Sequence, residues 1–148
     1  MERISRLVAV VALVLVSATP VAAQTAAGRI DRLSGTAFVV RAGSQMAIKA
    51  GDEVFETDVL RTGADGHVGV TLKDDTRLSL GPGGEVRLER FVYAPAEGKL
   101  ALGLKVVKGI VAYVSGKMAK LAPDSVRLET PAAIVGVRGT TLVIQAQE

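Results

Sequence analysis

The sequence contains no cysteine and no tryptophan, and its only histidine is His67. Without cysteine the chain can form no disulfide, no thiolate metal site and no thiol nucleophile. The single imidazole has no second histidine or cysteine with which to share a metal ion, so we interpret His67 as an exposed strand residue. A Gly-x-Ser-x-Gly motif is absent as well, which leaves the serine-hydrolase template without support. We therefore expect a protein that is not an enzyme and that has no cofactor and no metal site.

Aromatic residues are scarce, since the chain has only two tyrosines and three phenylalanines. Bases of single-stranded nucleic acids usually stack on aromatic side chains, and sugar-binding sites are commonly lined with them. Residues 81–85, Gly-Pro-Gly-Gly-Glu, are not followed by the lysine and hydroxyl of a phosphate-binding loop. Nucleic acids, sugars and nucleotides are therefore poor candidates for a ligand.

The amino terminus has the three-part layout of a secretory signal peptide. Arg3 and Arg6 precede an uncharged apolar run, residues 7–16, and small residues follow up to Ala23. This run is shorter than the roughly 20 residues that a membrane-spanning helix needs. We expect a helical signal peptide over residues 1–23 and one domain over residues 24–148, periplasmic or secreted and without a membrane span after cleavage. The alternative is that the segment stays attached as an anchor.

Charge is nearly balanced in the expected mature chain. Because the signal segment holds Arg3, Arg6 and Glu2, 16 of the 18 basic and 14 of the 15 acidic side chains remain, unlike the strongly basic surface of a nucleic-acid-binding protein. The charges are unevenly placed, with an early acidic cluster and a later stretch that has lysines but no acid. The acids are Asp52, Glu53, Glu56 and Asp58, and the lysines are Lys99, Lys105, Lys108, Lys117 and Lys120. We interpret both groups as solvated strand faces; the alternative is a weak docking surface for an anionic envelope component or partner.

Apolar residues recur at every second position through much of the chain, which places them on one face of a strand. They are Val68, Val70, Leu72, Leu78, Leu80, Val86, Leu88, Leu100, Leu102, Leu104 and Val106. Tight turns at residues 73–76 and 81–84 separate the first three of these strands and predict an antiparallel meander. Asp74 and Asp75 fit the first turn, because aspartate bonds its own backbone there. Residues 93–99 predict a hairpin loop, and residues 116–121 at most one helical turn.

Near the carboxyl end, the stretch Thr-Pro-Ala-Ala-Ile-Val-Gly-Val-Arg-Gly-Thr-Thr-Leu-Val-Ile-Gln, residues 130–145, holds the candidate interaction residues. They are Thr130, Pro131, Gly136, Arg138, Gly139 and Thr140. Pro131 forces an extended residue before it, and the glycines stand where a strand bends or another backbone comes close. Arg138 either clamps acceptors within the domain or contacts a partner. The apolar segments on both sides are continuous, so we expect both of their faces to be covered.

A faint internal echo relates residues 60–70 to residues 128–137, because each reads as Leu-x-Thr, a turn and Val-Gly-Val. Two such units could stack as coils of a short solenoid or pair across a sandwich. The expected fold class is therefore all-β, as an antiparallel meander or sandwich or as a short β-solenoid-like domain.

Several motifs occur together: Ala-Gly-Asp-Glu-Val at residues 50–54, Leu-Lys-Asp-Asp-Thr-Arg-Leu-Ser-Leu at 72–80, Lys-Gly-Ile-Val at 108–111, and Val-Arg-Leu-Glu-Thr-Pro-Ala-Ala-Ile-Val-Gly-Val-Arg-Gly-Thr at 126–140. This set resembles the FecR protein domain of bacterial cell-envelope proteins, with Asp75 where a glycine is commoner. The likeness covers essentially the whole expected mature chain. It implies a periplasmic all-β domain that is used for sensing or interaction.

The resemblance further implies a role known from the best-known members of this family. In them the domain follows a cytoplasmic anti-sigma segment and a transmembrane helix, and it relays the state of an outer-membrane iron-siderophore receptor to a sigma factor. Here a cleavable signal stands at the amino terminus. We therefore expect a free-standing envelope module that binds another envelope protein or a polymer, rather than a direct regulator of iron-siderophore signalling. The alternative is a structural or self-assembling surface protein, and the oligomeric state stays open.

Overall fold

The computed structural model describes residues 17–18, 24–137 and 141–147. The expected signal helix lies in residues 1–16 and 19–23, outside these ranges, and so do Arg138, Gly139 and Thr140. Within the described ranges, no helix is long and apolar enough to cross a membrane.

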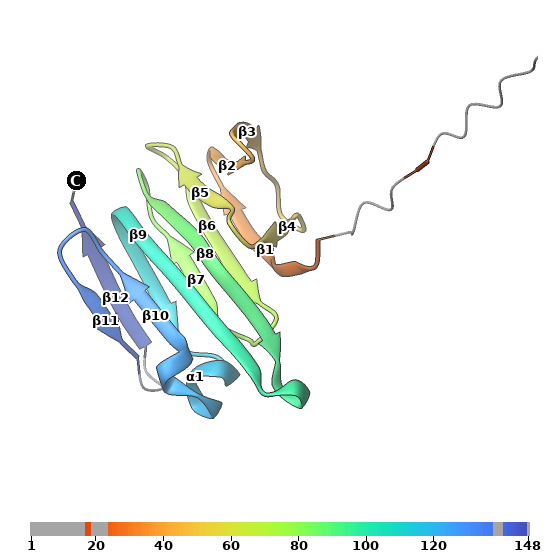
Figure 1. Cartoon of the computed structure of the whole chain (residues 1–148). Helices are drawn as coiled ribbons and strands as arrows, with labels where there is room; N and C mark the ends of the chain where they lie inside the picture. The colour runs from red at the N-terminus through yellow and green to blue at the C-terminus, as the bar shows by residue number, and fades with distance from the viewer. Residues whose placement is uncertain (1–16, 19–23, 138–140, 148) are drawn as a thin grey trace, which may run out of the picture.

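The described residues form twelve strands of one sheet, which curls into two layers (Figure 1). The first layer contains β1 (Ala26–Ser34), β4 (Glu53–Phe55), β6 (His67–Leu72), β7 (Arg77–Leu80) and β12 (Thr141–Ala146). The second contains β2 (Ala37–Arg41), β3 (Ser44–Ala47), β5 (Val59–Thr62), β8 (Glu85–Ala94), β10 (Val126–Glu129) and β11 (Ile134–Gly136). The long strand β9 (Lys99–Val114) belongs to both layers. The expected all-β class is confirmed.

Neighbouring strands follow the order β3-β2-β5-β8-β9-β7-β6-β1-β4, and the layers are joined at both sides. On one side β1 leads through Gly35, whose φ is +69°, into β2. On the other side β9 bends at Gly109, whose φ is +88°. A Cβ at Gly109 would lie 2.6 Å from the Cα of Gly84. Only glycine combines this left-handed backbone with so close an approach.

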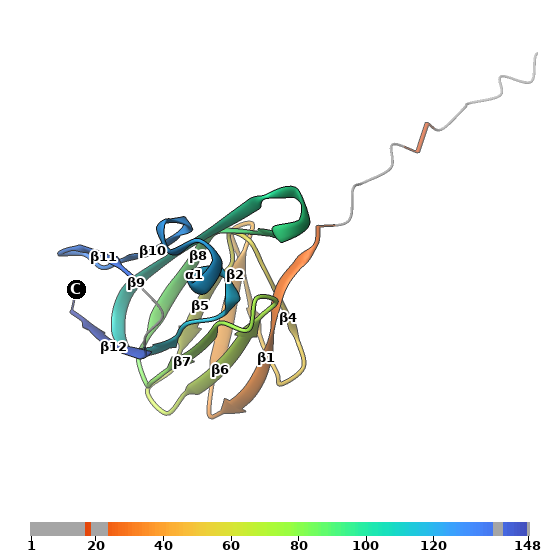
Figure 2. The same cartoon turned by 90° about the horizontal axis from the view of Figure 1, so that it is seen from below.

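The core lies between the layers and consists of the alternating apolar residues, as the period of two predicts. Fully buried side chains come from both layers, among them Ile30, Leu72, Leu80, Leu102, Leu104 and Tyr113. The short helix α1 (Lys117–Leu121) lies at one end of the layered sheet (Figure 2). It buries Met118 completely and Ala119 almost completely. The helix therefore closes that end of the core, and the expected single helical turn at residues 116–121 is confirmed.

Asp74, in the turn between β6 and β7, holds α1 in place. Its carboxylate is fully buried and accepts hydrogen bonds from the Thr76 backbone N–H at 3.1 Å and the Thr76 hydroxyl at 2.8 Å. It also accepts a bond from the Met118 N–H at 3.3 Å, and the Asp74 carbonyl accepts one from the Lys117 N–H at 2.7 Å. The predicted bonding of Asp74 to its own turn is confirmed, and the same side chain also satisfies a free N–H at the start of the helix.

The expected meander is only partly right. β6 and β7 form the predicted antiparallel hairpin, and residues 93–99 close the hairpin of β8 and β9 through a 3-10 turn, Pro95–Glu97. However, β7 pairs with β9 in the first layer, whereas β8 pairs with β5 and β9 in the second. Residues 81–84 therefore carry the chain from one layer to the other, because local alternation cannot tell a hairpin from a crossing.

The two halves of the internal echo have different structural roles. Residues 60–70 lead from β5 in the second layer to β6 in the first, whereas residues 128–137 include the hairpin of β10 and β11 within the second layer. They do not stack as repeated coils. Among the alternatives that the sequence left open, the structure is a two-layered sandwich with joined sides.

Candidate interaction site

The carboxyl-terminal margin consists of β10, β11 and β12 together with β9, with which β10 and β12 pair. β10 pairs in parallel with the first half of β9, and β12 pairs antiparallel with its last six residues. Seen from below, the β10–β11 hairpin and β12 diverge from β9 toward the edge of the molecule (Figure 2). Among the described strands, β11 pairs only with β10 and β12 only with β9. Both strands are therefore edges with one unpaired side.

Apolar side chains on this margin face solvent. Ile134 on β11 is 62% exposed, Val143 on β12 is 70% exposed and Ile110 on β9 is 51% exposed. The other faces of β11 and β12 carry Val135 and Leu142, which pack partly against the core. The expectation that both faces of these strands are covered is therefore wrong, because Ile134 and Val143 lie on faces that are open to solvent. Neither strand contains a charged residue, although edge strands are usually protected by charge, proline or a bulge.

Thr130 and Pro131 lie in the turn that joins β10 to β11. The Thr130 N–H donates to the Ala133 carbonyl at 2.8 Å, and the Thr130 Oγ1 accepts from the Ala133 N–H at 3.1 Å and the Ala132 N–H at 3.3 Å. Pro131 is exposed within this turn. The role of Thr130 that the structure shows is to close the hairpin that presents Ile134.

Gly136 pairs with Arg127 at the outer end of β11. A Cβ placed on Gly136 would meet no heavy atom of the described residues within 4 Å. Of the two alternatives for this glycine, a bend of the strand or a close backbone, no close backbone is present among the described residues, and the bend stays a prediction. The remaining candidates, Arg138, Gly139 and Thr140, lie outside the described residues, so both hypotheses for Arg138 stand as predictions.

The opposite side of the molecule, the amino-terminal margin of β1 to β4, is held by an ion pair between the partly exposed Arg41 and the buried Asp58. Arg41 donates from Nε to Asp58 Oδ1 at 2.9 Å and from Nη2 to Asp58 Oδ2 at 2.7 Å. Asp58 is fully buried and also accepts the Phe55 N–H at 2.9 Å. The hydrogen bond to Asp58 raises the pKa of Arg41, and its guanidinium lies 4.6 Å from the centre of the Phe55 ring. The interpretation of Asp58 as part of a solvated acidic face is wrong, because this fork neutralises it in the interior.

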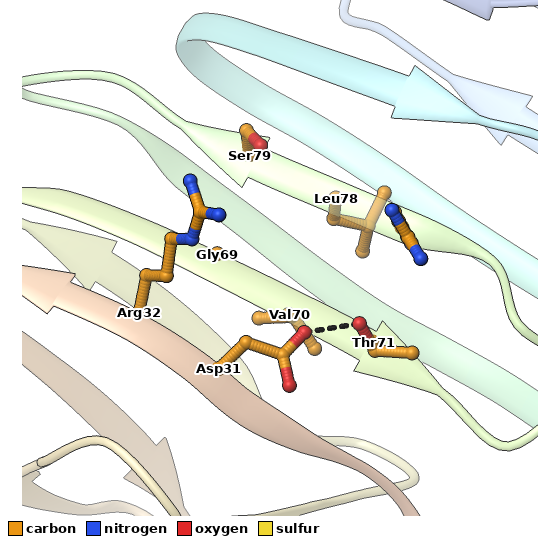
Figure 3. Close-up of a pocket in the computed structure, with 8 residues that line it drawn as sticks. Asp31, Arg32, Gly69, Val70, Thr71, Leu78 and Ser79 are labelled. Atoms are coloured by element: carbon orange, nitrogen blue, oxygen red, sulfur yellow. Dashed lines mark hydrogen bonds between the residues drawn. The ribbon is translucent and has the colours of Figure 1, made fainter.

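A second surface feature is a shallow groove of about 500 Å³ on the outer face of the first layer (Figure 3). Gly69 on β6 and Ser79 on β7 form its floor, and Arg32 on β1 extends over Gly69. Asp31 accepts a hydrogen bond from the Thr71 hydroxyl. Arg77 of β7 also lines the groove, and His67 lies exposed on the same strand as Gly69, as predicted. Among the described residues, no group of three or more potential metal ligands is present here or elsewhere.

The sequence model of the FecR protein family matches residues 58–148, well over half of the chain. The chain belongs to the FecR protein family. No curated protein and no solved structure matches it. The resemblance seen in the sequence is thus confirmed over β5 to β12, a shorter range than the whole mature chain.

The FecR match covers the carboxyl-terminal margin, including all six candidate residues, and begins at the buried partner of Arg41. The groove is divided, because Gly69, Arg77 and Ser79 lie within the match and Asp31 and Arg32 precede it. Sequence reasoning missed the groove. Alternation alone placed Gly69 on the opposite face from Val68 and Val70, but it could not show that β1 and β7 flank β6.

Proposed function

We propose that this FecR-family chain is a non-enzymatic interaction module of the bacterial cell envelope, which binds a partner protein at the carboxyl-terminal margin and serves envelope sensing. The observation that carries the proposal is the pair of uncharged edge strands, β11 and β12, with exposed Ile134 and Val143. A large apolar side chain on an unpaired edge favours association with another chain.

Strand addition at β12 is the proposed mode of binding. The strand has six residues, and its partner β9 occupies one side only in the described structure. An extended segment can pair with the other side through main-chain hydrogen bonds, while pockets for alternate side chains set specificity. Val143 then supplies an apolar contact beside the added strand.

Capture from an envelope extract tests this mode with charge-bearing edge variants. We expect the mature domain to retain a specific partner, and Val143→Lys and Ile134→Lys to lose it, because a lysine on an edge strand opposes pairing. Met46→Lys is the matched control, since Met46 is a 42% exposed apolar residue on β3, at the edge of the amino-terminal margin. Equal retention by all four proteins would exclude the carboxyl-terminal margin as the binding surface.

Self-assembly is a second candidate function that the same open edge favours, since two copies of β12 could pair with each other. Light scattering of the purified domain would then rise with protein concentration, and Val143→Lys would abolish the rise. A wild-type domain that stays monomeric at all concentrations while it retains an extract partner excludes this candidate.

Periplasmic or secreted location is part of the proposal and rests on the signal-like residues 1–23 and on the family. Fractionation of cells that express the full chain, followed by mass spectrometry of the amino terminus, tests it. We expect an envelope or secreted product that begins at Gln24; a product found only in the cytoplasm with residues 1–23 intact would contradict the assignment.

A further inference from the structure

We propose that the groove on the outer face of the first layer binds carboxylate side chains of an acidic peptide segment. The groove is distinct from the edge of β12, and its occupation does not depend on strand addition there. Its basis is the juxtaposition of two arginines with a floor that has almost no side chains.

A bulge in β1 helps to build the groove. The pairing of β1 with β6 shifts register between Ile30 and Arg32, so Asp31 and Arg32 together face the position of Gly69. Bulges of this kind redirect side chains, and here Arg32 extends over Gly69 toward Ser79 (Figure 3). Because Gly69 has no side chain, the Arg32 guanidinium and the floor of the groove stay accessible.

The groove carries a net positive charge, since its lining residues include two arginines, Arg32 and Arg77, and one carboxylate, that of Asp31. Within the described part of the chain, neither Arg32 nor Arg77 forms an ion pair, whereas Arg41, Arg61, Arg87 and Arg127 do. The one carboxylate in the groove, that of Asp31, already accepts the Thr71 hydroxyl. Arg29 and Glu53, which pair with each other between β1 and β4 beside Thr71, add one charge of each sign at the rim. A ligand that enters this groove therefore meets an excess of guanidinium groups.

Guanidinium groups bind carboxylates through two parallel hydrogen bonds, which makes them suited to this ligand. No aromatic residue lines the groove, so it offers no ring on which a sugar or a base could stack. Three of the lining residues, Arg32, Gly69 and Ser79, form one register row across the strands. At roughly 4.8 Å between neighbouring strands this row is about 10 Å long, the length of about three extended residues. The shape and charge thus fit a short acidic peptide that crosses the strands.

Fluorescence anisotropy with labelled hexaglutamate as the probe tests the proposal on the mature domain, with hexalysine as the charge control. We expect hexaglutamate to bind and hexalysine not to bind. Replacement of both arginines, Arg32→Gln with Arg77→Gln, should weaken binding about tenfold or more, because charge-assisted hydrogen bonds contribute at this scale. Absence of hexaglutamate binding to the wild-type domain would overturn the proposal.

Filling the groove provides a second variant that leaves the charges in place. A Cβ at Gly69 would lie 3.5 Å from Arg32 Cβ, an ordinary contact, and valine suits a strand. Gly69→Val should therefore fold and bind hexaglutamate about tenfold more weakly. Gly103→Val is the matched control, because Gly103 lies in the second layer beside Arg90 with the same 3.5 Å contact to its Cβ. Equal weakening by both valines would contradict a site at Gly69.

Two further measurements separate peptide carboxylates from other anions and from the β12 edge. Inorganic phosphate that displaces hexaglutamate at equal concentration would overturn the proposal in favour of a general anion site. Val143→Lys should not weaken hexaglutamate binding, since Val143 does not line the groove and the lysine adds a positive charge to the same face. If Val143→Lys no longer retains the partner from envelope extract but still binds hexaglutamate, then binding in the groove is independent of binding at the β12 edge.

Discussion

The amino-terminal and carboxyl-terminal margins both join the two layers of the sheet, but they differ in how far their apolar side chains are buried. At each margin the chain passes from one layer to the other through a glycine with positive φ, Gly35 at one and Gly109 at the other. At the amino-terminal margin Val39 and Val54 are buried, at 4% and 2% exposure, and Met46 on the edge strand β3 is 42% exposed. At the carboxyl-terminal margin Val143 is 70% exposed. A joined pair of layers thus does not by itself cover its edges.

The difference arises from what lies beyond each crossing. β3 pairs with β2, and β4 pairs with β1. The ion pair between Arg41 and Asp58 joins the end of β2 to the residue that precedes β5. β3, β4, β11 and β12 each have one unpaired side in the described structure, so the ion pair of Arg41 with Asp58 is what sets the amino-terminal margin apart. The ion pair stabilises the first margin, whereas at the second Ile134 and Val143 are more exposed than Met46 is at the first. The following predictions test this division, from the largest expected effect to the smallest.

Gly109→Val should have the largest effect on stability. A side chain at this position combines the strain of a positive φ, about 1–3 kcal/mol, with a contact to the Gly84 backbone that cannot be relieved by a rotamer change. We expect the free energy of unfolding to fall by about 2–5 kcal/mol, measured by urea denaturation. A fall below about 1 kcal/mol would mean that β9 does not depend on the bend for its passage between layers.

Asp58→Ala should destabilise the amino-terminal margin by about 2–3 kcal/mol. The change leaves the Phe55 N–H without its acceptor and removes both bonds to Arg41. The loss stays below that of a fully buried pair because the Arg41 side chain is 33% exposed and can reach water. Asp65→Ala is the control at an exposed acid of the same segment, where Thr36 holds the pKa of Asp65 below its usual value. Urea denaturation that gives equal losses for both variants would contradict the special role of Asp58.

Alkaline pH should weaken the fold through Tyr113, which lies on the inner face of β9. Burial raises the pKa of Tyr113 above its usual value of about 10. The unfolded chain therefore loses this proton first as pH rises, and between the two pKa values the folded state binds more protons. The stabilising contribution is complete below pH 10 and is lost as pH rises through the folded pKa.

Thermal unfolding across this range measures the effect. The melting temperature of the wild type should fall above pH 10 by more than that of Tyr113→Phe, which has no proton to lose at this site. Parallel pH profiles for the two proteins would show that the buried phenol is not the group responsible.

Gly136→Ala should have the smallest effect. Its Cβ has open space around it, so the free energy of unfolding should change by no more than about 0.5 kcal/mol. Circular dichroism during urea denaturation measures the free energy of unfolding. The value for Gly136→Ala can then be compared with that for Gly109→Val at the same margin. A loss of several kcal/mol would show that Gly136 is tightly packed, and would contradict the open space around β11.

Part of the fold could be predicted because its evidence is local. Alternation identified Val68, Val70 and Leu72 as one buried face, and Asp74 was correctly placed in a turn that it stabilises. The FecR family was identified from motifs that include residues 126–140, which lie within the family match. The crossing at residues 81–84 was missed, because a tight turn has the same composition whether the next strand pairs with the last one or joins another layer.

The candidate site was less predictable for the same reason. Whether Val143 is covered depends on which face of β12 is turned toward the core. Whether Asp58 is solvated depends on Arg41, which lies 17 residues away in the sequence. The groove needs residues of three strands, with Arg32, Gly69 and Ser79 in one row. Each of these facts is a property of strand pairing across the sheet, which a single sequence does not encode in its local pattern.

The sequence by itself determined the all-β class, the inward faces of the strands, the absence of cysteine chemistry and the FecR family. These properties follow from composition and from a period of two, both of which act within a few residues. Only the tertiary structure decided that one margin is sealed by Arg41 and Asp58, that the other leaves Ile134 and Val143 in solvent, and that Arg32 lies over Gly69. The reason is physical: burial and charge compensation are set by the neighbours that folding brings together from distant parts of the chain.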